Sequence, residues 1–133
     1  MILKLDKRWW IKVGRLPATC FEPGYYVYVG RAKRGLKGRI QRHLKKNKKI
    51  FWHIDYLTHY AQILNVLIKP GAYDECRTVR KLRKLIKDSA IPLRGFGASD
   101  CRCLGHLLYL PALTSIKNLE ELLFQTEGFK GLN

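Results

Sequence analysis

Short apolar runs and longer amphipathic segments follow one another along the chain, which predicts a mixture of strands and helices. The runs at residues 2–5, 9–13 and 24–29 are rich in β-branched and aromatic side chains, as strands are. Residues 63–68 form a continuous apolar run and predict a buried strand, and residues 107–110 predict another. With 133 residues the chain is long enough for one domain with its own core, and we find no internal repeat.

The segment after residue 35 has the period of an amphipathic helix. Leu36, Ile40 and Leu44 recur at four-residue steps and predict a single apolar stripe. Arg39 and His43 also lie four residues apart, and we expect them beside that stripe on one flank of the helix. The other basic side chains of the segment are expected to face water.

Two further helices are predicted nearer the middle and the end of the chain. Residues 50–57 are dense in aromatic side chains and indicate a short helix. His53 within it is expected to be a hydrogen-bonded core residue or, alternatively, to lie next to a metal or a phosphate. A Gly-rich loop spans residues 95–103, and Ser115 is expected to open a last helix that runs to about residue 124.

The helix that starts near residue 75 carries a carboxylate in an unusual place. Asp74 can cap this helix, and its apolar face should consist of Val79, Leu82 and Ile86. The helical angles place Glu75 on the same inward face. A carboxylate directed inward at a helix start is a candidate functional group, although a favourable charge at a helix N-terminus would explain it equally.

The charge of the chain is strongly positive and unevenly distributed. Lys and Arg number 26 against 10 Asp and Glu, a formal net charge of +16, and ten of the basic residues lie between positions 31 and 49 with no acidic residue among them. This excess predicts a polyanionic partner, most simply nucleic acid, with an anionic membrane surface as the alternative. The residues expected to contact nucleic acid are Arg31, Lys33, Arg34, Lys37, Arg42, Lys45, Lys46, Lys48 and Lys49.

The composition also bears on location and on the cysteines. No apolar run approaches the roughly 20 residues of a membrane span, and Lys4 follows the first apolar residues at once, so we expect a cytoplasmic protein that does not enter membranes. Cys101-x-Cys103-x-x-His106 offers three soft ligands, and Cys76 can supply a fourth. Zinc binding, a disulfide from Cys76 to Cys101 or Cys103, and free thiols are the three interpretations. Cys20 has the pattern of an ordinary strand residue.

Several motifs in order resemble a known family. Residues 24–30, Gly-Tyr-Tyr-Val-Tyr-Val-Gly, and residues 35–44, which contain Arg39 and His43, are similar to the GIY-YIG nuclease superfamily. Residues 52–57, Glu75-Cys76 and the Gly-rich loop with its two cysteines sharpen the likeness. They resemble a largely archaeal branch that is also found fused to endonuclease III-type DNA glycosylases.

The resemblance covers about residues 1–110 and carries expectations about the fold. It implies an α+β domain in which a small antiparallel sheet is flanked by helices. Residues 111–133 would then form an extra C-terminal helical extension packed on the same domain.

The resemblance also implies a chemistry, the cutting of phosphodiesters with one divalent metal ion. Carried over, Tyr28 is the tyrosine of the second motif, Arg39 the helix arginine, and Glu75 the candidate ligand for Mg²⁺ or Mn²⁺. Phosphoryl transfer needs a positioned nucleophile, a cation and a carboxylate that holds the metal. Tyr28 can orient or deprotonate a water, Arg39 can contact two phosphate oxygens, and His43 is a second candidate for proton transfer or phosphate contact.

One departure from the family keeps two functions open. Residues 1–5 carry neither the Gly nor the Tyr of the first family strand. Because Tyr28, Arg39 and Glu75 match the family, we still expect a metal-dependent DNA endonuclease of repair or recombination, with a DNA-repair glycosylase as a candidate partner. The alternative is a module that kept the basic groove, lost the chemistry and binds DNA or RNA.

Overall fold

The computed structural model describes residues 1–31, 35–45, 47–69, 74–98, 101, 103–126 and 128–131. Its elements are β1 (Ile2–Leu5), β2 (Trp9–Ile11), β3 (Thr19–Phe21), β4 (Gly24–Tyr28), α1 (Leu36–Leu44), α2 (His53–Thr58), β5 (Gln62–Asn65), β6 (Leu67–Ile68), α3 (Glu75–Leu85), β7 (Leu107–Leu110), α4 (Leu113–Thr126) and β8 (Lys130–Gly131). A four-stranded antiparallel sheet of order β5-β1-β4-β7 lies at the centre. The mixed α+β architecture with a small antiparallel sheet is as expected.

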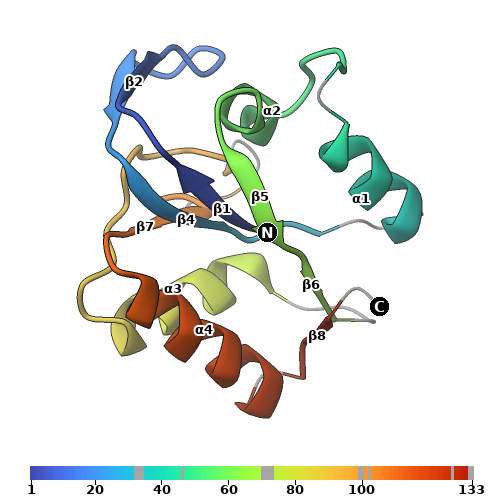
Figure 1. Ribbon diagram of the computed structural model, residues 1–133, viewed down its shortest axis with the longest axis vertical. Coiled ribbons are helices and arrows are strands. Elements are labelled where there is room, and N and C mark those ends of the chain that lie inside the picture. The colour runs from blue at the N-terminus through green and yellow to red at the C-terminus, as the bar shows by residue number, and fades with distance from the viewer. Residues whose placement is uncertain are drawn as a thin grey trace.

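The central sheet separates two hydrophobic cores, because successive side chains of a strand point to opposite faces. On one face Tyr26 and Leu107 pack with α2 and the β2–β3 hairpin. On the other face Val27 and Leu108 pack with α3 and α4 (Figure 1). Residues that follow β4 and precede β7 therefore lie at one end of the sheet, within reach of elements from both faces.

Helix α1 lies at the periphery, and its buried side differs from the predicted stripe. Ile40 and His43 are buried, whereas Leu36 is 38% and Leu44 is 47% exposed. The prediction of a Leu36–Ile40–Leu44 stripe was wrong because α1 does not pack on the sheet. It packs on the aromatic segment before α2, where Trp52 contacts His43.

The sequence predicted one buried strand at residues 63–68, and this prediction was wrong. β5 is an edge strand that pairs only with β1 in the central sheet, and alternate residues of it are exposed. The chain leaves the sheet at Val66, whose N–H donates to Asn65 Oδ1. The last part of the run forms β6, which pairs with β8. Apolar continuity alone did not reveal this break.

The last two helices were predicted with different accuracy. In α3 the predicted face of Val79, Leu82 and Ile86 is buried, and Asp74 accepts a hydrogen bond from the Arg77 N–H as the cap. Helix α4 begins two residues before Ser115, whose hydroxyl donates to Asp88 Oδ2 rather than capping the helix.

In the described part of the chain no helix has the length and apolarity to cross a membrane.

Candidate nucleic-acid and metal site

Tyr28 ends β4, and two glycines enclose its ring. A side-chain carbon on Gly30 would lie 2.8 Å from Tyr28 Cε2, and one on Gly97 would lie 3.0 Å from Tyr28 Cε1. Gly97 also has a φ of +68°, which disfavours any other residue. Packing therefore explains the glycine of the Tyr28-Val29-Gly30 motif, because any side chain at position 30 would collide with the Tyr28 ring.

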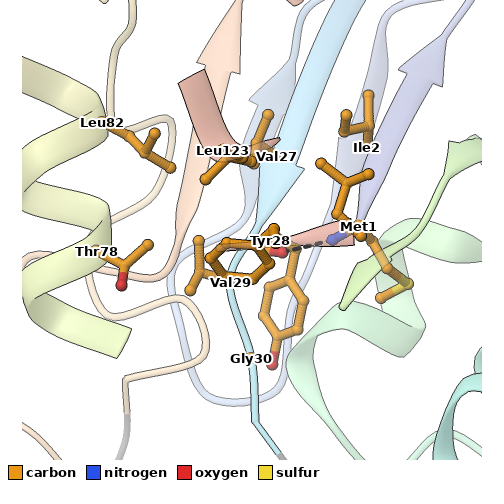
Figure 2. Close-up of a pocket in the computed structure, with 11 residues that line it drawn as sticks. Met1, Ile2, Val27, Tyr28, Val29, Gly30, Thr78, Leu82 and Leu123 are labelled. Carbon is orange, nitrogen blue, oxygen red and sulfur yellow. Dashed lines mark hydrogen bonds between the residues drawn. The ribbon is translucent and has the colours of Figure 1, made fainter. Parts of the chain in front are cut away.

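A small pocket of about 50 Å³ borders Tyr28 but is not the candidate site. Its wall is mainly apolar and is formed by residues such as Val27, Leu82 and Leu123 on the α3–α4 side of the sheet. Figure 2 shows the Tyr28 ring running away from these side chains. The polar groups of the candidate site, which belong to Arg31, Arg39 and Glu75, lie beyond the end of β4 instead.

Arg31 connects the candidate residues of α1 and α3. Its Nε lies 3.1 Å from Glu75 Oε1, and its carbonyl accepts a hydrogen bond of 2.6 Å from Arg39 Nη1. Glu75 keeps 19% of its side chain exposed and Arg31 keeps 50%. The two residues that the sequence selected from different helices are therefore joined through one exposed arginine.

Trp52 supports the arginine side of the site. The guanidinium carbons of Arg39 and Arg42 lie 4.3 and 4.5 Å from the centre of its ring, which are cation–π contacts. These contacts place both guanidinium groups against the same ring. The sequence indicated an aromatic cluster here but did not pair it with Arg39.

Asp55 anchors α1 to α2 and was not predicted in this role. Its side chain is fully buried and accepts two hydrogen bonds from Arg42, of 3.0 and 2.9 Å, and others from the Phe51 and Trp52 N–H groups. Burial alone would raise the pKa of Asp55, but these hydrogen bonds outweigh it and the pKa is lowered. The sequence predicted that Arg42 contacts nucleic acid; in the structure its guanidinium is paired with Asp55.

His43 lies inside the α1–Trp52 contact. It is 9% exposed, its ring centre is 5.8 Å from that of Trp52, and Nδ1 is 3.8 Å from Asp55 Oδ1. Burial lowers the pKa of His43 to about 4 in spite of the attraction of Asp55. The imidazole is therefore neutral near pH 7, and the ring is placed as a packing residue.

The remaining basic candidates divide into exposed and engaged side chains. Lys37, Lys45 and Lys49 are exposed, and Lys48 donates to the carbonyls of His43 and Lys45 at the end of α1. Phe51, which is 77% exposed, comes two residues after Lys49 in the chain. Three other candidates, Lys33, Arg34 and Lys46, lie outside the described residues.

The cysteine cluster predicted from spacing is present. Cys76 Sγ lies 3.3 Å from Cys101 Sγ, 3.0 Å from Cys103 Sγ and 3.3 Å from His106 Nε2. All four ligand atoms lie within 4.8 Å of one another, so this Cys₃His cluster can hold a metal ion such as zinc. No disulfide joins the described cysteines, and Cys20 in β3 stands apart from the cluster.

The same histidine contacts Glu75 from its other side. His106 Nδ1 is buried and lies 3.2 Å from Glu75 Oε2, without a well-aligned hydrogen bond to any described group. Burial, followed by the neighbouring thiols, raises the pKa of Cys76 to about 12. The Cys76 thiol thus stays protonated until a cation displaces its proton.

His53 is placed by the Gly-rich loop. Its Nδ1 accepts a hydrogen bond of 2.8 Å from the Gly97 N–H, and its ring packs edge-on against Phe96. Burial lowers the pKa of His53. The sequence left His53 as either a hydrogen-bonded residue or a residue next to a metal or a phosphate. Its contacts are those of a hydrogen-bonded residue.

Comparison with known proteins identifies one family. The model described as "Domain of unknown function DUF123" matches residues 1–128. The chain belongs to this family. No curated protein and no solved structure matches it. The DUF123 match includes β7 and all of α4, so it covers both the tyrosine end of the sheet and the Cys₃His cluster.

Proposed function

We propose that this DUF123 protein binds nucleic acid and cuts phosphodiester bonds in DNA as a nuclease of the GIY-YIG type. The observation that carries the proposal is the chain of contacts from Glu75 through Arg31 to Arg39 at the end of β4 that Tyr28 occupies. A carboxylate can hold a divalent metal ion, guanidinium groups can bind phosphate oxygens, and a phenol can orient a water. The net charge of +16 supports a polyanionic substrate.

Each group has a place in the proposed reaction. Tyr28 would orient the attacking water, whose proton would pass to the surrounding solvent, and Arg39 would bind two non-bridging oxygens. Glu75 would hold a divalent ion, which would supply Lewis-acid stabilisation of the leaving oxygen. Arg31 Nε lies 3.1 Å from Glu75 Oε1, so Arg31 occupies the side of Glu75 at which the metal would bind. A bound phosphate would attract Arg31 away and free that oxygen for the divalent ion.

The proposal includes two kinds of metal. A single carboxylate together with substrate phosphates and waters is the setting in which Mg²⁺ or Mn²⁺ binds. Three thiols and an imidazole instead select a soft tetrahedral ion, and we assign zinc to the Cys₃His cluster.

A second candidate function is a binding module without catalysis. It is favoured by the first strand, which offers no tyrosine, and by Glu75, both of whose oxygens lie beside other side chains. In that case the exposed lysines of α1 and its flank would bind nucleic acid, and no metal would act at Glu75.

Cleavage assays separate the two functions. Duplex, branched, flap and single-stranded DNA would be incubated with Mg²⁺ or Mn²⁺, and we expect nicking by wild type only with metal. Glu75→Gln should abolish cutting, while fluorescence anisotropy should show that the variant still binds DNA. Arg39→Lys should lose about 100-fold or more in rate, because an ammonium cannot make the forked contact. No cleavage of any substrate by wild type would leave the binding module as the function.

A further inference from the structure

The geometry of the Cys₃His cluster is close to that of a closed tetrahedral site. Zinc bonds of about 2.3 Å to sulfur place neighbouring ligand atoms about 3.8 Å apart. Five of the six separations in the cluster are between 3.0 and 3.4 Å, so small rotations of the side chains would admit the ion. The ligands come from the first turn of α3 and from the loop before β7.

Glu75 has the position of an outer-shell carboxylate. Metal-binding imidazoles commonly donate their second N–H to a carboxylate, which fixes the ring and its tautomer. In His106, Nε2 faces the sulfur atoms, and Nδ1 is buried with Glu75 Oε2 at 3.2 Å. With zinc on Nε2, the proton must reside on Nδ1, where Glu75 is the acceptor.

The opposite oxygen of Glu75 faces the nucleic-acid side. Oε1 contacts Arg31, and the Arg31 carbonyl holds Arg39. Glu75 and Cys76 are adjacent at the start of α3, so one ion can influence both. The two oxygens of a single carboxylate thus connect a metal ligand with the arginines.

We propose that Glu75 is the outer-shell carboxylate of the zinc site, and that bound zinc thereby positions Glu75 and Arg31 for nucleic acid. The second half of this statement rests on the proposed function. Loss of the ion would release His106, and Glu75 and Arg31 would no longer be held in register with Arg39. The protein would then bind DNA more weakly although the exposed lysines are intact.

Metal content tests the ligand set. Protein purified without chelators should contain about one zinc atom per chain by mass spectrometry, and Cys103→Ser should lose it. Cys20→Ser is the matched control and should keep it, because Cys20 lies in β3 outside the cluster. Iron in place of zinc, or no zinc even after equimolar addition, would overturn the assignment.

Zinc affinity tests the role of Glu75 with a variant that keeps all four ligands. In competition with a chromophoric chelator, Glu75→Gln should bind zinc about 10–100-fold more weakly than wild type, with unchanged stoichiometry. Glu121→Gln, an exposed carboxylate of α4, should match wild type. Equal affinity of Glu75→Gln and wild type would overturn the outer-shell role.

DNA affinity of zinc-loaded and zinc-free protein tests the coupling. We expect removal of zinc to weaken duplex binding about fivefold or more in wild type and much less in Arg31→Ala. A wild-type affinity that does not change with zinc would overturn the coupling while the proposed function stands. If neither form binds DNA, the proposed function and the coupling that rests on it both fail, while the zinc affinities still decide the role of Glu75.

Discussion

At the scale of single residues, glycine and tyrosine are matched around the end of β4. Gly30 and Gly97 each contact the Tyr28 ring from a different side, and Gly97 also adjoins His106. The hydroxyl of Tyr28 lies beside both glycines, since side-chain carbons there would be 3.3 and 3.6 Å from its oxygen. Small residues at these two positions therefore determine where the candidate hydroxyl can lie.

Substitution of Gly97 tests this packing. Gly97→Ala would combine a left-handed backbone with a contact of 3.0 Å to Tyr28, and we expect a loss of about 1–3 kcal/mol in the free energy of unfolding. Gly38→Ala is the control, because Gly38 lies within α1 and the added carbon would have no heavy atom of the described residues within 4 Å outside the helix backbone. It should gain about 0.5–1 kcal/mol. Urea denaturation of both variants measures the difference, and equal effects would contradict the packing account.

Buried His43 predicts a dependence of stability on pH. Its folded pKa of about 4 lies below the ordinary value of 6.5, so only the unfolded chain takes up the proton between these values. The stabilisation from neutral His43 is therefore complete above pH 6.5 and is lost as the pH falls toward 4. About 1–2 kcal/mol of the free energy of unfolding should disappear between pH 6.5 and pH 5.

Urea unfolding at these two pH values checks the prediction for His43. His43→Gln should show a smaller loss of stability on acidification than wild type, because the titrating group is gone. The surrounding charges are Asp55, Arg42, Arg39 and Lys48, and they remain in the variant. An identical loss in both proteins would show that other groups cause the pH dependence.

At the scale of elements, α1 is held to the domain by polar contacts more than by apolar ones. Ile40 is its buried aliphatic residue, whereas Arg42 and Asp55 form the connection to α2. The β2–β3 hairpin is attached differently, with Trp9 stacked on Tyr60 at 4.7 Å between ring centres. Positioning of Arg39 therefore depends on a buried ion pair and on Trp52.

Removal of the buried carboxylate tests the attachment of α1. Asp55→Ala would leave Arg42 and two backbone N–H groups without their acceptor, and we expect a loss of about 2–4 kcal/mol in the free energy of unfolding. Asp6→Asn, which removes an exposed ion pair with Lys4 at 3.7 Å, should change it by less than about 1 kcal/mol. Chemical denaturation distinguishes them, and a neutral Asp55→Ala would refute the anchoring role.

At the scale of the whole molecule, positive charge is spread over both sides of the sheet. Lys37, Lys45 and Lys49 are exposed near the candidate site, and Lys84, Lys87 and Lys117 are exposed on the α3–α4 side. Charge alone therefore does not locate a nucleic-acid surface. The exposed Phe51, which packs edge-on against Trp52, offers a ring on which a base can stack.

Salt dependence of duplex binding distinguishes the two sides. Replacement of Lys37, Lys45 and Lys49 by alanine should reduce the slope of log affinity against log salt by about 2 to 3, as three phosphate contacts are lost. Replacement of Lys84, Lys87 and Lys117 removes the same charge and should change the slope much less. If both triple variants respond equally, binding does not centre on α1.

Local patterns in the sequence determined much of the fold and one of the sites. The apolar face of α3, the Asp74 cap and the strands at Ile2–Leu5 and Leu107–Leu110 follow from short-range periodicity and are present as predicted. The Cys₃His cluster also follows from spacing, because soft ligands of this kind combine in few ways.

Tertiary structure alone decided how distant segments pair. The sequence contains nothing that assigns Arg42 to Asp55, Glu75 to His106, or Leu36 to solvent, since each depends on which element lies against which. Periodicity describes one element and its inward side, whereas burial of a charge or an exposed leucine is set by the neighbouring element. For that reason the inward face of α3 was predictable from the sequence, whereas the inward face of α1 and the Glu75–Arg31–Arg39 connection were not.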